Sequence, residues 1–204
     1  MIFLRALGII LGLACLGFAR ADGIADSSQT DFEANFKAGQ SEVAAGGQVL
    51  FSPFIATGGR PTVNYGGGLI QYGYMLNDLK ESGSLRGNFE VLGELAGSSI
   101  FVGDGTYVAS ATFWLRYNLV LSGWRFIPFV QIGGGISLTD ADHDVFGQTF
   151  NFNLDVAPGV RYFVTPHCSL NAEYRYQHIS NANIAKHNLG INAQGVALSV
   201  SWYF

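Results

Sequence analysis

Charged side chains are scarce in this sequence. Asp, Glu, Lys and Arg make up 13 % of its 204 residues, whereas a soluble domain usually carries about 25 %. The formal net charge is −4, so nothing in the charge balance indicates a nucleic acid partner. The sequence therefore predicts a surface that is unusually poor in charge and a chain that binds no nucleic acid.

Cysteines and long hydrophobic runs are also few. The first 21 residues combine a positive start, an apolar run over 6–18 and a small-residue cleavage site, the layout of a secretory signal peptide. A lipoprotein signal at Cys15 is disfavoured, because Gly12 stands where such signals carry leucine. Removal of 1–21 leaves Cys168 as the single cysteine and excludes an internal disulfide. No later run reaches about 18 apolar residues, which excludes transmembrane helices.

Apolar and polar residues alternate over long segments of the remaining chain, which is the pattern of β-strands. In residues 150–164 the even positions are mostly aromatic or aliphatic, and the odd positions are mostly polar or small. Pro128 and Pro158 count against strands locally, because proline has no N–H to donate. The pattern predicts about eight strands, over residues 42–51, 62–75, 89–95, 110–119, 126–138, 150–164, 169–176 and 190–204.

Isolated charges on the polar faces of these segments distinguish two all-β architectures. A soluble β-sandwich would turn its polar faces toward water and bury its apolar faces. A small closed barrel instead pairs acids and bases in its interior and exposes apolar side chains to lipid. The charges stand singly among Gly, Ser, Asn and Thr, which favours the barrel. They are Glu90, Glu94, Arg116, Asp155, Arg161, Glu173 and Arg175.

The last segment favours the barrel as well. Apolar residues alternate from Val196 to Phe204, which resembles the C-terminal signal read by the barrel assembly machinery of the outer membrane. We therefore predict an all-β fold, an eight-stranded antiparallel transmembrane β-barrel of the outer membrane, over residues 41–204. Residues 22–40 are polar and lack strand periodicity, so we expect a flexible or loosely packed N-terminal segment there.

Connection lengths predict how this barrel is oriented. With both termini in the periplasm, successive hairpins alternate between the two sides of the membrane. The short links 121–124 and 165–169 are then periplasmic, and the longer links 139–147 and 181–190 are extracellular. The link 77–88 is longer than this scheme expects of a periplasmic turn.

A His-x-Ser pattern lies where the segment before the last strand ends. His178 and Ser180 share the parity of the lipid-facing residues, and Asn192 has the lipid-facing parity of the next strand. Polar side chains that face lipid suggest a functional site, although a polar strand rim is the plainer alternative.

The chemistry of these residues suits acyl transfer. Side chains at i and i+2 of a strand stand roughly 6.5–7 Å apart at Cα, so the His178 imidazole can reach the Ser180 hydroxyl and take its proton. Asn192 would orient the ring. Backbone N–H groups near Asn181 and Asn183 would bind the oxyanion of the intermediate.

The same stretch resembles a known family. HISNAN at 178–183 and NLGIN at 188–192, followed by an amphipathic last strand, are similar to the lipid A 3-O-deacylase (PagL-type) family, also called acyloxyacyl hydrolase-like. The resemblance is clearest over 159–204. It implies an outer-membrane barrel of a Gram-negative bacterium whose active site faces the outer leaflet. Its implied activity is removal of the 3-position acyl chain from the lipid A of lipopolysaccharide.

The resemblance also implies residue roles. His178 would be the base, Ser180 the nucleophile and Asn181 a contributor to the oxyanion hole, with no metal or cofactor. The family's triad acid, a Glu, falls at Asn192 by the spacing of the motif. An amide can fix the tautomer of the imidazole, but it cannot stabilise imidazolium by charge.

Two function hypotheses therefore follow from the sequence. The first is a serine ester hydrolase that acts on lipid A. The second is a non-catalytic outer-membrane barrel with a structural or adhesive role that keeps the motif without the acid. The acidic stretch 140–144 is interpreted as a solvated loop rather than a calcium site, because no Glu follows at EF-hand spacing. His167 and His187 are interpreted as surface residues.

Overall fold

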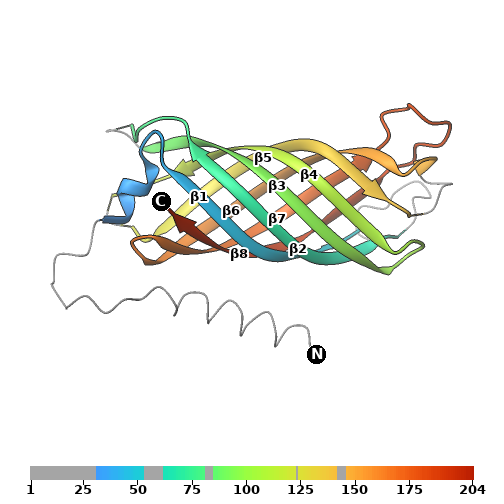
Figure 1. Ribbon diagram of the computed structural model, residues 1–204, viewed down its shortest axis with the longest axis horizontal. Coiled ribbons are helices and arrows are strands. Elements are labelled where there is room, and N and C mark those ends of the chain that lie inside the picture. The colour runs from blue at the N-terminus through green and yellow to red at the C-terminus, as the bar shows by residue number, and fades with distance from the viewer. Residues whose placement is uncertain (1–30, 53–61, 81–84, 123, 142–145) are drawn as a thin grey trace. The chain divides into compact units, whose positions relative to one another are not determined.

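Eight antiparallel strands close into a barrel, in which each strand pairs with the next along the chain and β8 pairs with β1 (Figure 1). The computed structural model describes residues 31–52, 62–80, 85–122, 124–141 and 146–204. The strands are β1 Ser41–Phe51, β2 Asn64–Met75, β3 Gly87–Val102, β4 Tyr107–Leu119, β5 Phe126–Thr139, β6 Phe150–Thr165, β7 Cys168–Ser180 and β8 Ile191–Tyr203. The predicted antiparallel barrel is confirmed, and a β-sandwich is excluded because β1 and β8 pair rather than forming edges.

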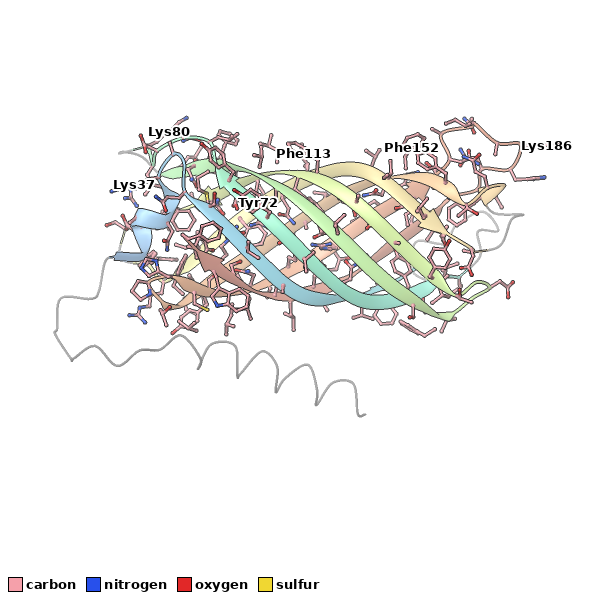
Figure 2. The ribbon with its side chains drawn as sticks, viewed as in Figure 1. Lys37, Tyr72, Lys80, Phe113, Phe152 and Lys186 are labelled. Carbon is pink, nitrogen blue, oxygen red and sulfur yellow. The ribbon has the colours of Figure 1, made fainter. Side chains whose placement is uncertain are left out.

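The alternation of the sequence becomes an outer and an inner face of the barrel wall. Tyr72 and Phe113, labelled in Figure 2, are 52 % and 61 % exposed. On β7, Leu170 and Tyr174 are exposed, whereas Asn171 and Glu173 between them are buried. An apolar outer wall around a polar interior is the inverse of a water-soluble domain and suits a surrounding of lipid. No helix among the described residues is long and apolar enough to cross a membrane.

Pro128 and Pro158 lie within strands, although their lack of an N–H counted against strands at these positions. Pro128 of β5 stands opposite Val160, and Pro158 of β6 stands opposite Val130. Pairing between β6 and β7 passes from Val156–Tyr176 to Gly159–Glu173 without a change of register. The neighbouring ladder bonds therefore hold the strands in place across a residue that cannot donate.

The barrel interior is filled by paired charges. Arg161 bonds Glu42 at 2.8 Å and Glu90 at 2.8 Å, and Arg116 lies 3.2 Å from Glu42. Arg175 bonds Glu94 at 2.6 Å and Glu173 at 2.8 Å in a second group. The charges that the sequence placed inside are all buried. Their pairing offsets the cost of removing them from water.

A short 3-10 helix, η1 Asp31–Phe36, precedes the barrel. Phe32 and Phe36 are buried in a cluster with residues of β2, β5, β6, β8 and the β4–β5 connection, and Asn88 Nδ2 donates to the Phe36 carbonyl at 3.0 Å. These two aromatic side chains pack at one end of the barrel, a contact that the missing strand periodicity of residues 22–40 does not reveal. The signal peptide 1–21 and residues 22–30 lie outside the described residues.

Candidate active site

His178 and Ser180 lie at the end of β7 that is opposite to η1. Ser180 is the last residue of the strand. Both side chains are half-buried on the outer face, while Ile179 between them is fully buried inside the barrel. The outward placement that the sequence predicted for this pair therefore holds to the end of the strand.

Asn192 of β8 completes a row of three side chains. It stands directly opposite His178 in the β7–β8 ladder. His178 Nδ1 lies 2.6 Å from Asn192 Oδ1, and His178 Nε2 lies 3.0 Å from Ser180 Oγ. A carbonyl oxygen can only accept, so Nδ1 carries the ring proton and donates it. The lone pair on Nε2 then faces the serine hydroxyl, the arrangement in which a neutral imidazole acts as a base.

Asn181, which the sequence offered for the oxyanion, is engaged elsewhere. Its backbone N–H donates to Asn188 Oδ1 at 2.9 Å. Its buried side-chain amide donates to the carbonyls of Phe146 and His187. These donors all have partners in the loops, so Asn181 ties the loop after β7 in place, and its part in an oxyanion hole stays a prediction. The physical reason is burial, since an amide inside a loop must find partners there.

Asn183 remains the other candidate for the oxyanion. It has a positive φ of 63°, as Ala182 before it has a φ of 54°. Its side-chain oxygen accepts from Asn188 Nδ2 at 2.9 Å. Asn188 thus binds both Asn181 and Asn183, a role that sequence reasoning missed because a loop has no periodicity to reveal partners.

Gly190 is a second residue that sequence reasoning did not assign to the site. Its φ is +66°, and a Cβ there would lie 2.8 Å from the Ile179 carbonyl oxygen. The same Cβ would lie 3.3 Å from Ser180 Cβ and 3.4 Å from His178 Cε1. Glycine is therefore required by the backbone conformation and by the closeness of the catalytic candidates. The position of Gly190 directly before the last strand is the feature of the sequence that could have indicated its role.

Apolar side chains line the wall beside this row. On β6, Phe152 stands opposite Ser180, and Leu154 stands opposite His178 and is 64 % exposed. Figure 2 labels Phe152 near the end of the barrel that carries the site. Deeper along the same wall, the Tyr174 hydroxyl donates to Gln194 Oε1. An acyl chain lying against β6 and β7 would bring its ester to the polar row.

Asp140 belongs to the acidic stretch 140–144, which was considered as a calcium site, and lies apart from this row. Asp140 accepts from the N–H and the hydroxyl of Thr106 and from the N–H of Tyr107, at 2.8, 2.5 and 2.9 Å. These bonds, with the Thr106 hydroxyl foremost, lower the pKa of the Asp140 carboxyl to about 2. Residues 142–144 of the acidic stretch lie outside the described part of the chain.

No group of three or more His, Cys, Asp or Glu side chains in the described ranges could hold a metal ion. His167 is exposed at the turn between β6 and β7, and His187 is exposed in the loop between β7 and β8. Both are surface residues, as the sequence predicted.

Comparison with known proteins gives the relatives of this barrel. A family model described as lipid A 3-O-deacylase (PagL) matches residues 64–201. The crystal structure of Neisserial surface protein A shares 19 % identity at a TM-score of 0.58, covering 82 % of this chain and 98 % of that one. The crystal structure of the outer membrane enzyme PagL shares 16 % identity at a TM-score of 0.54, covering 78 % and 97 %.

The N-terminal β-barrel domain of Pseudomonas aeruginosa OprF is similar as well. It shares 18 % identity at a TM-score of 0.50, covering 82 % of this chain and 98 % of that one. No functionally curated protein matches the chain. At these identities the solved structures establish the fold, that of a small outer-membrane β-barrel.

Proposed function

Because the chain belongs to the lipid A 3-O-deacylase (PagL) family, we propose that it hydrolyses the 3-position ester of lipid A in the outer membrane. The observation that carries this proposal is the hydrogen-bonded row of Ser180, His178 and Asn192 on the lipid-facing wall. An ester in the adjoining leaflet can reach such a row without leaving the membrane. The barrel would be inserted by the barrel assembly machinery with this end toward the outer leaflet.

The proposed reaction runs through an acyl-enzyme. Ser180 Oγ attacks the ester carbonyl as His178 Nε2 takes the hydroxyl proton. Collapse of the tetrahedral intermediate breaks the bond to the sugar oxygen, which receives that proton from His178. Water, activated by the same imidazole, then attacks the acyl-enzyme and releases the fatty acid, and the proton returns to Ser180 Oγ.

Asn192 has a limited part in this cycle. Its Oδ1 holds the proton of the imidazole on Nδ1, which keeps Nε2 free to act as the base. It brings no negative charge to stabilise the imidazolium that forms during the attack. The imidazole is in the tautomer that catalysis needs, so what is missing is only the charge of a carboxylate beside the imidazolium, and for that reason a slow enzyme is expected.

Mass spectrometry of the products tests the proposal. The detergent-purified protein is incubated with lipid A, and released 3-hydroxy acyl chains are measured over time. Wild type should release them, Ser180→Ala and His178→Ala should not, and Ser99→Ala should match wild type. Ser99 is an exposed outward serine of β3 and serves as the control. No release by wild type, or equal release by Ser180→Ala, contradicts the proposal.

A second candidate function is a non-catalytic outer-membrane barrel with a structural or adhesive role. The observation that favours it is the amide at position 192, where the resemblance led us to expect a carboxylate. The variant Asn192→Glu distinguishes the two candidates. If wild type is silent and Asn192→Glu releases acyl chains, the site has lost its acid and the second candidate holds. If wild type turns over, the site is a working esterase, and Asn192→Glu should be faster because the carboxylate stabilises the imidazolium.

A further inference from the structure

The loop between β7 and β8, residues 181–190, is held in a defined shape. Ile184 N–H donates to the Asn181 carbonyl at 3.1 Å, which forms a turn directly after the strand. Asn181 and Asn188 cross-link the loop through the bonds described above. Gly147 of the neighbouring connection packs against it, because a Cβ at Gly147 would lie 3.0 Å from the His187 carbonyl oxygen. Side chains at the tip of this loop are therefore presented from a fixed backbone.

Lys186 lies at that tip, exposed to solvent. Figure 2 shows its side chain extending away from the strand ends. It is the single Lys or Arg at this end of the barrel within the described ranges. The remaining described cations are either inside the barrel or at the η1 end; they are Arg116, Arg161 and Arg175 inside, and Lys37, Lys80, Arg86 and Arg125 at the other end. Lys186 forms no ion pair with a described residue.

Exposed apolar side chains stand on either side of this cation. Ile184 is 66 % exposed and Leu189 is 45 % exposed. An ammonium group above apolar side chains is the composition of an interfacial anchor, in which the charge meets lipid head groups and the apolar part meets acyl chains. The six residue-to-residue steps from Ser180 to Lys186 span at most about 20 Å even if fully extended. Ser180 and Lys186 can therefore contact the same large glycolipid.

We infer that Lys186 binds a phosphoryl group on the sugar head of the glycolipid whose ester reaches Ser180. This inference rests on the proposed esterase function and adds a positioning contact to it: Lys186 holds the phosphate, and the bound phosphate places the ester at Ser180. The β7–β8 loop then binds the head group of the lipid, and in the chain it comes directly after the strand that carries the nucleophile. The ammonium supplies one charge-assisted contact, and Ile184 and Leu189 hold the loop at the boundary of the leaflet.

Paired substrates test the inference. Lipid A with its phosphates and the same lipid after enzymatic dephosphorylation are compared as substrates of detergent-purified wild type, Lys186→Ala, Lys186→Glu and Lys186→Arg. Lys80→Ala, which removes an exposed lysine at the η1 end, is the matched control. We expect Lys186→Ala to lower kcat/KM about fivefold on the phosphorylated lipid, mainly through KM, and to leave the dephosphorylated lipid unaffected. Lys186→Glu should lose more, and Lys186→Arg should retain the wild-type value.

Equilibrium binding separates this inference from the esterase proposal. Ser180→Ala and the double variant Ser180→Ala/Lys186→Ala are titrated with the two lipids, and neither consumes its ligand. Weaker binding of the phosphorylated lipid alone by the double variant supports the role of Lys186, even if wild type hydrolyses neither lipid. Equal affinities of the two variants for the phosphorylated lipid, or equal losses on both lipids, overturn it. The difference should shrink at high ionic strength, because the contact is exposed to screening.

Discussion

At the scale of single residues, Asn192 and Gly190 set what the His178–Ser180 pair can do. Asn192 orients the imidazole through one hydrogen bond but adds no charge. Gly190 leaves room beside the pair, since a Cβ at this position would lie 3.3 Å from Ser180 Cβ and 3.4 Å from His178 Cε1. The two residues act in different ways: one limits the stabilisation of the transition state, and the other preserves the geometry in which a proton can move.

Substitution of Gly190 by alanine should reduce activity more than stability. The new methyl group would press on Ser180 and His178, and a misplacement of about 1 Å can cost up to a hundredfold in rate. We expect kcat for lipid A to fall between about tenfold and a hundredfold, measured by acyl-chain release. The strain of alanine at positive φ adds about 1–3 kcal/mol of destabilisation.

The matched control for that prediction is Gly97→Ala on β3. A Cβ at Gly97 meets nothing within 4 Å, and its φ is not in the left-handed region. This variant should keep the rate of wild type. If Gly190→Ala also keeps it, the crowding argument for Gly190 is wrong.

At the scale of elements, hydrogen bonds from a few side chains join the connections at the end of the barrel that carries the site. Asp140, which follows β5, binds the start of β4 through Thr106 and Tyr107. Asn181, which follows β7, binds the β5–β6 connection at Phe146. The β5–β6 connection is thus joined both to the β3–β4 connection and to the β7–β8 loop, which directly follows the strand of His178 and Ser180.

The contact of Asp140 should persist to low pH. Its folded-state pKa is lowered to about 2 by the bonds from Thr106 and Tyr107. A carboxyl group whose pKa is lowered in the folded state stabilises that state at pH values above its ordinary pKa. This contribution is therefore present above about pH 4 and is lost as the pH falls toward about 2. The amide chemical shifts of Thr106 and Tyr107, followed by NMR, should stay constant from neutral pH to about pH 4 and then move.

Asp140→Asn provides the control for that titration. The amide keeps an oxygen that can accept, but it does not titrate, so the shifts of Thr106 and Tyr107 should remain flat over the whole range. A titration in wild type centred at or above the ordinary carboxyl pKa would show that the three hydrogen bonds do not form.

At the scale of the whole molecule, ion pairs in the polar interior connect strands that do not pair with each other in the barrel wall. Arg161 of β6 reaches Glu42 of β1 and Glu90 of β3, and it donates to the Tyr203 hydroxyl of β8 at 2.7 Å. One guanidinium therefore connects four strands that are distant in the sequence. Breaking a buried ion pair by removing one partner typically costs about 3–5 kcal/mol, because the remaining charge is left unpaired.

Arg161→Met should accordingly destabilise the barrel by about 3–5 kcal/mol. The measurement is the urea midpoint of unfolding in detergent or in lipid vesicles, followed by tryptophan fluorescence. Arg125→Met, which removes an exposed arginine at the η1 end, should shift the midpoint little. Equal midpoints for wild type and Arg161→Met would mean that the interior pairs add nothing to stability.

The sequence by itself determined the strands and the faces of their side chains. Period-two alternation requires every second residue to share a face, so the outward placement of His178 and Ser180 followed from Leu170 and Tyr174. The antiparallel order of the last two strands then brought Asn192 to the same patch. These features depend on the local geometry of a strand, which the alternation of residues in the sequence determines.

Only the tertiary structure decided the contacts that no period describes. Closure of the barrel paired Arg161 with Glu42, which is 119 residues away, because strands from opposite ends of the chain meet inside. Packing ordered η1 through Phe32 and Phe36, although residues 22–40 show no strand pattern. Burial gave the Asn181 donors partners in the loops, at Asn188, Phe146 and His187. In each case the partner is chosen by distance in space, which a linear pattern does not record.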